Sequence, residues 1–328
     1  SENNDIIKMK RKINQVGTGT LTVSLPRIWI KNNNLNKGDE IDLEIKDTEI
    51  LIRKDEITRI QKKAELNLDE FNKVMIDRFI HEFYRQGIGE IILTFTKEKI
   101  PDYRYNTQIS VEEYIKDRIS NFIGLEIISH TKNRIVLENL ITKEECQKID
   151  LVRKRIYFLL KEFLDEFCVG MEGDFKSFFE KNEYYHRNIT KFIYYYLRLL
   201  NFSDIPINKK MRLFGLYTLI IKIKHKIRHT SERILEMKRI TPKIIRYVKD
   251  IFDLFLDELN HYHQKDLSIK KIEELIKNRY KLFWRINKEK FNEDELRVIS
   301  DCKFLIDIID IFIETNISLN IEKYTENI

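Results

Sequence analysis

The most telling part of the chain spans residues 9–54 and reads MKRKINQVGTGTLTVSLPRIWIKNNNLNKGDEIDLEIKDTEILIRK. Apolar residues alternate with polar ones at 20–25 and again at 41–45, which is the pattern of short half-buried strands. Pro26 suits the first position of a short helix, and the Lys-Gly-Asp-Glu run supplies a later turn. The segment predicts a compact unit of four short strands, the first of them basic, and one helix.

The size and charge of this N-terminal unit suggest what it binds. A unit this small buries too little apolar surface to be stable alone, so we expect it to pair with a second copy. Residues 1–31 carry six basic and two acidic side chains, whereas residues 32–60 carry five basic and eight acidic ones. One edge is therefore basic and the other acidic, and a basic edge suits contact with phosphate groups.

The basic strand, the Gly-Thr-Gly-Thr loop, the strand that ends in Ser-Leu-Pro, the Trp-containing helix and the Lys-Gly-Asp-Glu turn together resemble the AbrB/SpoVT swapped-hairpin family. The resemblance implies that two protomers exchange hairpins into one small β-barrel and that basic residues on and after the first strand contact DNA. Proteins of this family also include antitoxins that neutralise toxins and heads that serve only for dimerisation. The DNA-binding residues that the resemblance implies are Lys8, Lys10, Arg11, Lys12, Thr18, Thr20, Arg27 and Lys31.

Length and composition point to a folded chain with more than one domain. The chain has 328 residues, 42% of them hydrophobic, and a net charge of +6, a mild basic excess that permits nucleic-acid or acidic partners. Its three cysteines are far apart in sequence, so we expect neither disulfides nor thiolate metal sites, and a reducing cytoplasm fits. We find no export signal and no membrane-spanning segment.

Residues 59–142 predict a small α+β connecting domain. Helical spacing runs up to Gly87, a second helix is expected at 111–122, and strands are expected at 90–96, 125–130 and 134–138. A polar loop that contains Pro101 should separate the first strand from the second helix. The domain has no glycine-rich phosphate loop and no nucleophile motif, so we expect it to connect the other parts or to support a dimer.

Residues 143–328 predict a six-helix bundle, because six long amphipathic segments follow one another with short connections. The expected helices cover 143–170, 174–201, 209–239, 241–264, 268–289 and 292–317. The fold class is thus multidomain and mainly α. The whole arrangement resembles phosphate uptake regulators in which a PhoU-like bundle of two three-helix units carries an AbrB-type head, a fusion typical of archaea.

The resemblance to PhoU-like bundles implies a metal held by two acids four residues apart on a helix. In this chain those positions fall on Lys224 and Arg228, and on His186 and Thr190, so the implied ligands are missing. His225 is interpreted as a surface residue rather than a zinc ligand. Two acidic stripes in the second half are weak metal candidates and are better explained as a solvated face; their relevant members are Asp253, Asp257, Asp307 and Asp310.

Residues 209–246 hold the largest concentration of charge, with twelve basic and two acidic side chains. We hypothesise that this face binds an anion, which would be DNA, a phosphate-rich ligand or an acidic protein. The alternative is that it balances neighbouring acidic helices. The candidate residues are Lys222, Lys224, Lys226, Arg228 and Arg233.

These observations predict a cytoplasmic, homodimeric, DNA-binding transcription regulator whose PhoU-like bundle receives a signal, and the resemblance links it to phosphate uptake control. The alternative is a signalling adaptor whose bundle binds a transporter or a kinase and whose head does not bind DNA. We expect no enzymatic activity and no cofactor, because no catalytic set and no complete metal motif can be assembled from the sequence.

Overall fold

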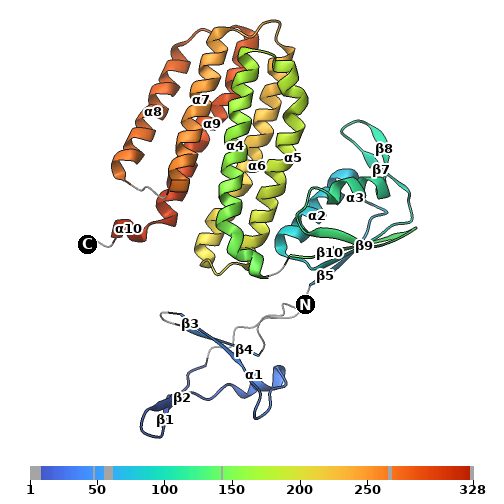
Figure 1. Cartoon of the computed structure of the whole chain (residues 1–328), viewed down its shortest axis with the longest axis vertical. Helices are drawn as coiled ribbons and strands as arrows, with labels where there is room; N and C mark the ends of the chain where they lie inside the picture. Colours follow the sequence, from blue (N-terminus) through green and yellow to red (C-terminus); the bar gives the residue numbers. More distant parts are fainter. Residues whose placement is uncertain (1–8, 47–48, 55–61, 142, 265–267, 326–328) are drawn as a thin grey trace. The chain divides into compact units, whose positions relative to one another are not determined.

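The computed structural model describes residues 9–46, 49–54, 62–141, 143–264 and 268–325. Most of the described chain is helical. The chain divides into two compact units, residues 1–61 and residues 62–328, which are described separately below (Figure 1).

The N-terminal unit consists of two β-hairpins and a short helix. In the first hairpin Asn14 pairs with Thr22, and in the second Asp42 pairs with Arg53. The two hairpins share no strand pairing among the described residues, and the expected barrel, which two protomers would form together, stays a prediction. The elements are β1 (Asn14–Val16), β2 (Thr20–Thr22), α1 (Arg27–Asn32), β3 (Asp42–Lys46) and β4 (Glu49–Arg53).

Local sequence explains the turn of the first hairpin. Gly17 has a φ of 71° at the tip of the first hairpin, a left-handed conformation that glycine adopts without strain. The first strand begins at Asn14, later than expected, so the basic residues 10–12 precede it rather than forming part of it. The helix α1 begins at Arg27, one residue later than predicted, and Pro26 precedes it as the N-cap.

Residues 62–141 form an α+β lobe with a four-stranded sheet of order β5-β6-β10-β9. The strand β5 is parallel to β6, and β10 is antiparallel to both β6 and β9. The elements are β5 (Lys63–Asn67), α2 (Lys73–Gln86), β6 (Glu90–Thr94), β7 (Lys99–Asp102), β8 (Thr107–Ser110), α3 (Val111–Ile119), β9 (Leu125–Thr131) and β10 (Arg134–Asn139).

Two features of the lobe differ from the sequence prediction. The residues around Pro101, expected to form a polar loop, form instead a hairpin of the strands β7 and β8, in which Pro101 pairs with Gln108. The strand β5 was not predicted, because its sequence KAELN has no strong apolar alternation and its pairing depends on β6. The helices and the strands β6, β9 and β10 lie where the periodicity predicted them.

The C-terminal part is a bundle of six long helices within the described ranges, as the sequence predicted. Its first helix begins at Ile149, because residues 143–148 form a 3₁₀ turn. The elements are the turn η1 (Lys143–Lys148) and the helices α4 (Ile149–Glu172), α5 (Phe175–Phe202), α6 (Ile207–Glu236), α7 (Pro242–Gln264), α8 (Ile269–Lys288), α9 (Glu293–Leu319) and α10 (Glu322–Thr325).

Capping side chains begin three of these helices at or next to the predicted starts. Asp174 caps α5 and Ser268 caps α8, while Asn292 forms a capping box with Glu295 at α9. The helix α6 packs between α5 and α9, and α7 packs on α4 and α9. The helix α8 lies at the outer side of the bundle, where it contacts α7 and α9 (Figure 1).

The lobe and the bundle are joined by buried contacts between α2 and α5. Asn201 donates a hydrogen bond to the carbonyl of Arg85, and Gly87, with a φ of 82°, ends α2 against the ring of Phe202. These contacts hold the lobe and the bundle in one compact unit. No helix in the described ranges has both the length and the apolar character needed to cross a lipid bilayer.

Candidate nucleic-acid interface

Five basic residues of the N-terminal unit that were predicted to contact DNA are exposed. Lys10, Arg11 and Lys12 are exposed in the segment before β1, and Arg27 and Lys31 are exposed on α1. Because Arg27 and Lys31 are four residues apart, they lie on the same face of α1. None of these five side chains forms an ion pair with a residue that the structure describes. They remain available for phosphate groups.

Two of the other residues predicted to contact DNA lie in the first hairpin, and the third lies outside the described residues. Thr18 lies in the turn of the first hairpin and Thr20 begins β2, and both are exposed. The hydroxyl groups of both residues are therefore accessible near the tip of the hairpin. Lys8 lies outside the described residues. The exposed cations predicted to contact DNA are called the basic edge below and are Lys10, Arg11, Lys12, Arg27 and Lys31.

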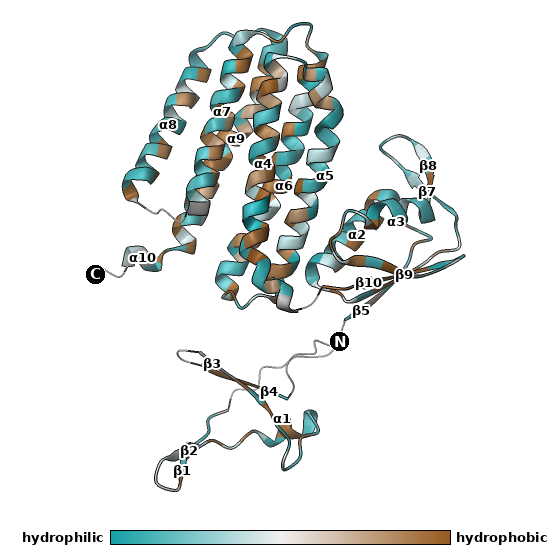
Figure 2. Ribbon diagram, viewed as in Figure 1, coloured by the Kyte–Doolittle hydropathy of each residue, from teal (hydrophilic) through white to brown (hydrophobic). Residues whose placement is uncertain are grey.

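The apolar side chains of both hairpins are exposed as well. Leu21 is 69% exposed, Ile45 is 80% exposed and Ile50 is 64% exposed. Figure 2 shows the colour of hydrophobic residues on β3 and β4. No residue whose burial is described between positions 9 and 54 is fully buried in the single chain, although Leu51 and Ile52 of β4 are partly buried. An exposed apolar surface in so small a unit requires a partner surface that covers it.

The five basic residues expected to form one face of α6 have different surroundings in the structure. Lys226 pairs with Asp301 of α9 at 2.5 Å, and Arg233 pairs with the same carboxylate at 3.0 Å. Arg228 lies 3.6 Å from Glu232, whereas Lys222 is exposed. Asp301, which the sequence analysis did not single out, is buried and balances two of the five candidates. Sequence spacing within α6 could not reveal it, because the contact joins two helices.

Lys224, the remaining candidate, points into the bundle and is fully buried. Its amine donates hydrogen bonds to the hydroxyl of Thr190 and to the carbonyl of His186, 3.3 Å away. Burial lowers the pKa of Lys224 well below its ordinary value, and Arg118 and Arg228 lower it further. Lys224 is therefore not part of a surface that could bind DNA.

The structure brings together three of the four positions where the PhoU resemblance would place metal ligands, whereas Arg228 lies near Glu232. Lys224 contacts both Thr190 and His186, and His186 Nε2 lies 3.2 Å from Nδ1 of His225. Burial lowers the pKa of His186 to about 2, and the neighbouring Lys224 adds to this effect. The site thus holds an amine, a neutral imidazole and a hydroxyl where carboxylates would be needed.

The weak metal candidates in the second half do not converge. Asp253 and Asp257 are exposed on α7, and Asp307 is exposed on α9. Asp310 forms an ion pair with Arg279 of α8 at 2.7 Å. Within the described ranges, no three side chains of metal-ligating type come close enough to hold an ion.

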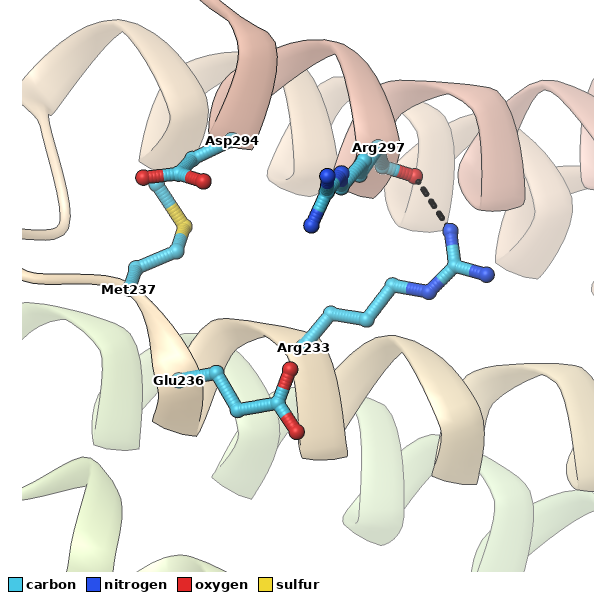
Figure 3. Close-up of a pocket in the computed structure, with 5 residues that line it drawn as sticks. All are labelled: Arg233, Glu236, Met237, Asp294 and Arg297. Carbon is cyan, nitrogen blue, oxygen red and sulfur yellow. Dashed lines mark hydrogen bonds between the residues drawn. The ribbon is translucent and has the colours of Figure 1, made fainter.

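A surface pocket of about 510 Å³ lies between the end of α6 and the start of α9 (Figure 3). Arg233 donates a hydrogen bond to the backbone carbonyl of Arg297 across it, at 3.0 Å. Its lining carries both signs of charge, because Glu236 and Asp294 accompany the two arginines. This mixture does not favour a simple anion.

The fold and the site define a mainly helical protein with a small N-terminal β-domain that presents a basic edge. Residues 15–59 match the family model described as "Antidote-toxin recognition MazE, bacterial antitoxin". The N-terminal domain is thus MazE/AbrB-like and antitoxin-type, and the C-terminal region is helical. No curated protein and no solved structure shows a significant match to this chain.

Proposed function

We propose that this protein is a homodimeric, DNA-binding transcription regulator. The observation that carries the proposal is the combination, in one MazE/AbrB-like domain, of an accessible basic edge and two hairpins with exposed apolar side chains. The apolar surface pairs with a second copy, and the basic edges of the two copies contact the DNA phosphates.

The pairing step follows from the hairpins. Val16 and Leu21 on one hairpin and Ile45 on the other expose more than half of their surface. Two copies that exchange or stack hairpins would remove these side chains from water and would close the open strand edges. A swapped-hairpin barrel is the arrangement that the resemblance to AbrB/SpoVT proteins implies.

The helical bundle is the regulatory part of this proposal. Its resemblance to PhoU-like bundles implies control of phosphate uptake, and the protein would act in the cytoplasm without catalysing a reaction. A regulator of this kind would transmit the state of the bundle to the head, which would then bind or release its operator.

DNA titration tests the proposal. Full-length protein is titrated with random and upstream-region duplexes at about 50 and 200 mM salt, because phosphate contacts make affinity fall steeply with salt. The variant Lys10→Ala, Arg11→Ala, Lys12→Ala should lose most of the binding. The matched control, Lys37→Ala, Lys54→Ala, Lys62→Ala, removes three exposed cations outside the basic edge and should bind like the wild type.

Sedimentation equilibrium tests the dimer. The wild type should sediment as a dimer, and a Leu21→Asp, Ile45→Asp variant should sediment as a monomer and lose its affinity for DNA. A monomeric wild type would contradict the proposal.

A second candidate function is favoured by the description of the matching family model, which names an antitoxin. In this case the head would dimerise or neutralise a toxin, and the bundle would act as an adaptor that binds a transporter or a kinase. A stable dimer with no affinity for DNA at about 50 mM salt would select this function over the first.

A further inference from the structure

The outer helix α8 presents a patch of cations and aromatic rings that the proposed function does not use. The patch lines an open hollow of about 600 Å³. Each member lies three or four residues from at least one other member, so they share one face of the helix. We define this α8 patch as Lys277, Tyr280, Lys281, Trp284, Arg285 and Lys288.

Most cations of the α8 patch are not neutralised by the protein. Arg285 forms an ion pair with Asp250 of α7. In contrast, Lys277, Lys281 and Lys288 form no ion pair with any described residue, and no acid lines the hollow. The patch thus differs from α6, where Lys226 and Arg233 are balanced by Asp301. Its positive charge is available to an external anion.

The two aromatic rings of the α8 patch are exposed to solvent rather than packed in the core of the bundle. Tyr280 is 51% exposed and Trp284 is 57% exposed. Four residues of α-helix rise by about 6 Å, so the two rings are neighbours along one face of the helix. The guanidinium of Arg279 lies over the ring of Tyr280, 5.1 Å from its centre, and the rings of Phe283 and Trp284 pack edge to face. Lys277 and Lys281 flank Tyr280, and Lys281 and Lys288 flank Trp284, which interleaves the rings with the charges.

The chemistry of the α8 patch favours one class of partner. A second copy of the same face is disfavoured, because three unpaired lysines would meet three others. Lysine is depleted at protein–protein interfaces, where arginine is the enriched cation, and lysine binds phosphate as a point charge. Exposed aromatic rings beside a row of cations match the way in which proteins bind nucleic-acid strands with unpaired bases.

We propose that the α8 patch binds single-stranded nucleic acid, with bases stacked on Tyr280 and Trp284 and the sugar–phosphate backbone held by Lys277, Lys281 and Lys288. Stacking requires the flat faces of the bases, which a duplex keeps covered, so the patch prefers single strands. This site is distinct from the basic edge of the head, and it does not depend on the head binding duplex DNA.

Fluorescence anisotropy of full-length protein with labelled oligo-dT and oligo-rU of about 20 nucleotides tests the proposal. The variant Lys277→Glu, Lys281→Glu should weaken single-strand binding at least about 10-fold, and Trp284→Ala should weaken it about 5-fold or more. The matched control, Lys176→Glu, Lys181→Glu, makes the same charge change at exposed positions of α5 and should leave affinity unchanged. Oligo-dT and oligo-rU distinguish DNA from RNA as the source of the strand.

The two tryptophans of the chain allow a direct readout of stacking. A Trp29→Phe variant leaves Trp284 as the one tryptophan of the sequence, and its fluorescence should be quenched by an unlabelled single strand. Unchanged fluorescence at saturating oligonucleotide would overturn the stacking assignment. Circular dichroism of each variant shows whether the bundle remains folded.

Other outcomes separate this site from the head and from different partners. The Lys10→Ala, Arg11→Ala, Lys12→Ala variant should keep single-strand binding even if it loses duplex binding. Loss of single-strand binding in this head variant, or equal affinity of the wild type and the α8 variant, would overturn the proposal. A different result would also overturn it. The wild type would bind vesicles that contain anionic lipid but would not bind the oligonucleotides, and Lys277→Glu, Lys281→Glu would abolish the vesicle binding.

Discussion

The guanidinium of Arg198 on α5 donates a hydrogen bond to the backbone carbonyl of Tyr84, 2.7 Å away, at the last turn of α2. Arg198 is only 3% exposed, and its guanidinium also lies over the ring of Tyr84, 5.1 Å from the ring centre. A cation at the C-terminus of a helix is favoured by the helix dipole. This contact therefore fastens the α+β lobe to the bundle.

We expect Arg198→Met to lower the free energy of unfolding by about 1–3 kcal/mol, because the hydrogen bond to the end of α2 is lost. Urea denaturation followed by circular dichroism measures the change. Arg187→Met removes a half-exposed arginine of the same helix and should change stability by less than about 0.5 kcal/mol. Equal effects of the two substitutions would show that Arg198 does not fasten the lobe.

Gly87 and Gly215 offer a matched pair of glycine substitutions. Gly87 has a φ of 82°, and a Cβ there would overlap the ring of Phe202, so Gly87→Ala should destabilise the protein by more than about 1 kcal/mol. Gly215 lies within α6, and a Cβ there meets nothing within 4 Å. Gly215→Ala should therefore stabilise the protein by up to about 1 kcal/mol. Thermal denaturation of both variants checks the opposite signs.

Glu258 of α7 should make stability depend on pH. Its side chain is fully buried, and neither carboxylate oxygen accepts a hydrogen bond from a described residue. Burial raises the pKa of Glu258 from 4.5 to about 8, although the charge of Lys271 acts in the opposite direction. The folded chain consequently binds more protons than the unfolded chain between these values, and stability falls as the pH rises through this window.

The Glu258→Gln variant removes this titration. At pH 8 it should be more stable than the wild type by about 1–3 kcal/mol, and the difference should shrink toward pH 4.5. Chemical denaturation over this range measures both curves. Glu273→Gln, at an exposed position of α8, is the control and should follow the wild-type curve. A gain in stability from Glu258→Gln that did not vary with pH would contradict the raised pKa of Glu258.

Lys224 should be a destabilising residue at neutral pH. Because burial lowers its pKa well below the ordinary 10.5, folding at pH 7 requires that an amine protonated in the unfolded chain lose its proton or its hydration. Stability due to this group rises with pH up to the ordinary pKa. We expect Lys224→Met to stabilise the protein at pH 7 by about 1 kcal/mol or more.

The control for Lys224 lies two residues earlier on the same helix. Lys222 is exposed, so Lys222→Met should change stability by less than about 0.5 kcal/mol. Denaturation at pH 7 and pH 10 measures both variants, and the gain from Lys224→Met should be smaller at pH 10. A large loss of stability in Lys224→Met would mean that its hydrogen bonds to His186 and Thr190 outweigh the cost of burying the amine.

Local periodicity predicted most helices and strands because their apolar spacing is repeated over many residues. The exceptions have a physical cause in each case. The strand β5 carries little pattern of its own and is defined by its pairing with β6. The hairpin around Pro101 has short strands, and their pairing is not visible as alternation in the sequence.

The candidate sites were harder to predict because charge on a helix says nothing about what lies beside it. Lys222, Lys224, Lys226, Arg228 and Arg233 share one helix and were expected to act together. The helix α6 packs against α5 on one side and α9 on the other, so these residues have different surroundings. The α8 patch, in contrast, is visible as a spacing in the sequence, but its exposure is not.

The sequence by itself determined the helices of the bundle, the turn of the first N-terminal hairpin and the run of cations before it, since each depends on residues close together in the chain. Tertiary structure alone decided that Lys224 is buried, that Asp301 neutralises two cations of α6, and that Arg198 binds the end of α2. These outcomes depend on which helices become neighbours, and burial and pairing are set by contacts between residues distant in sequence.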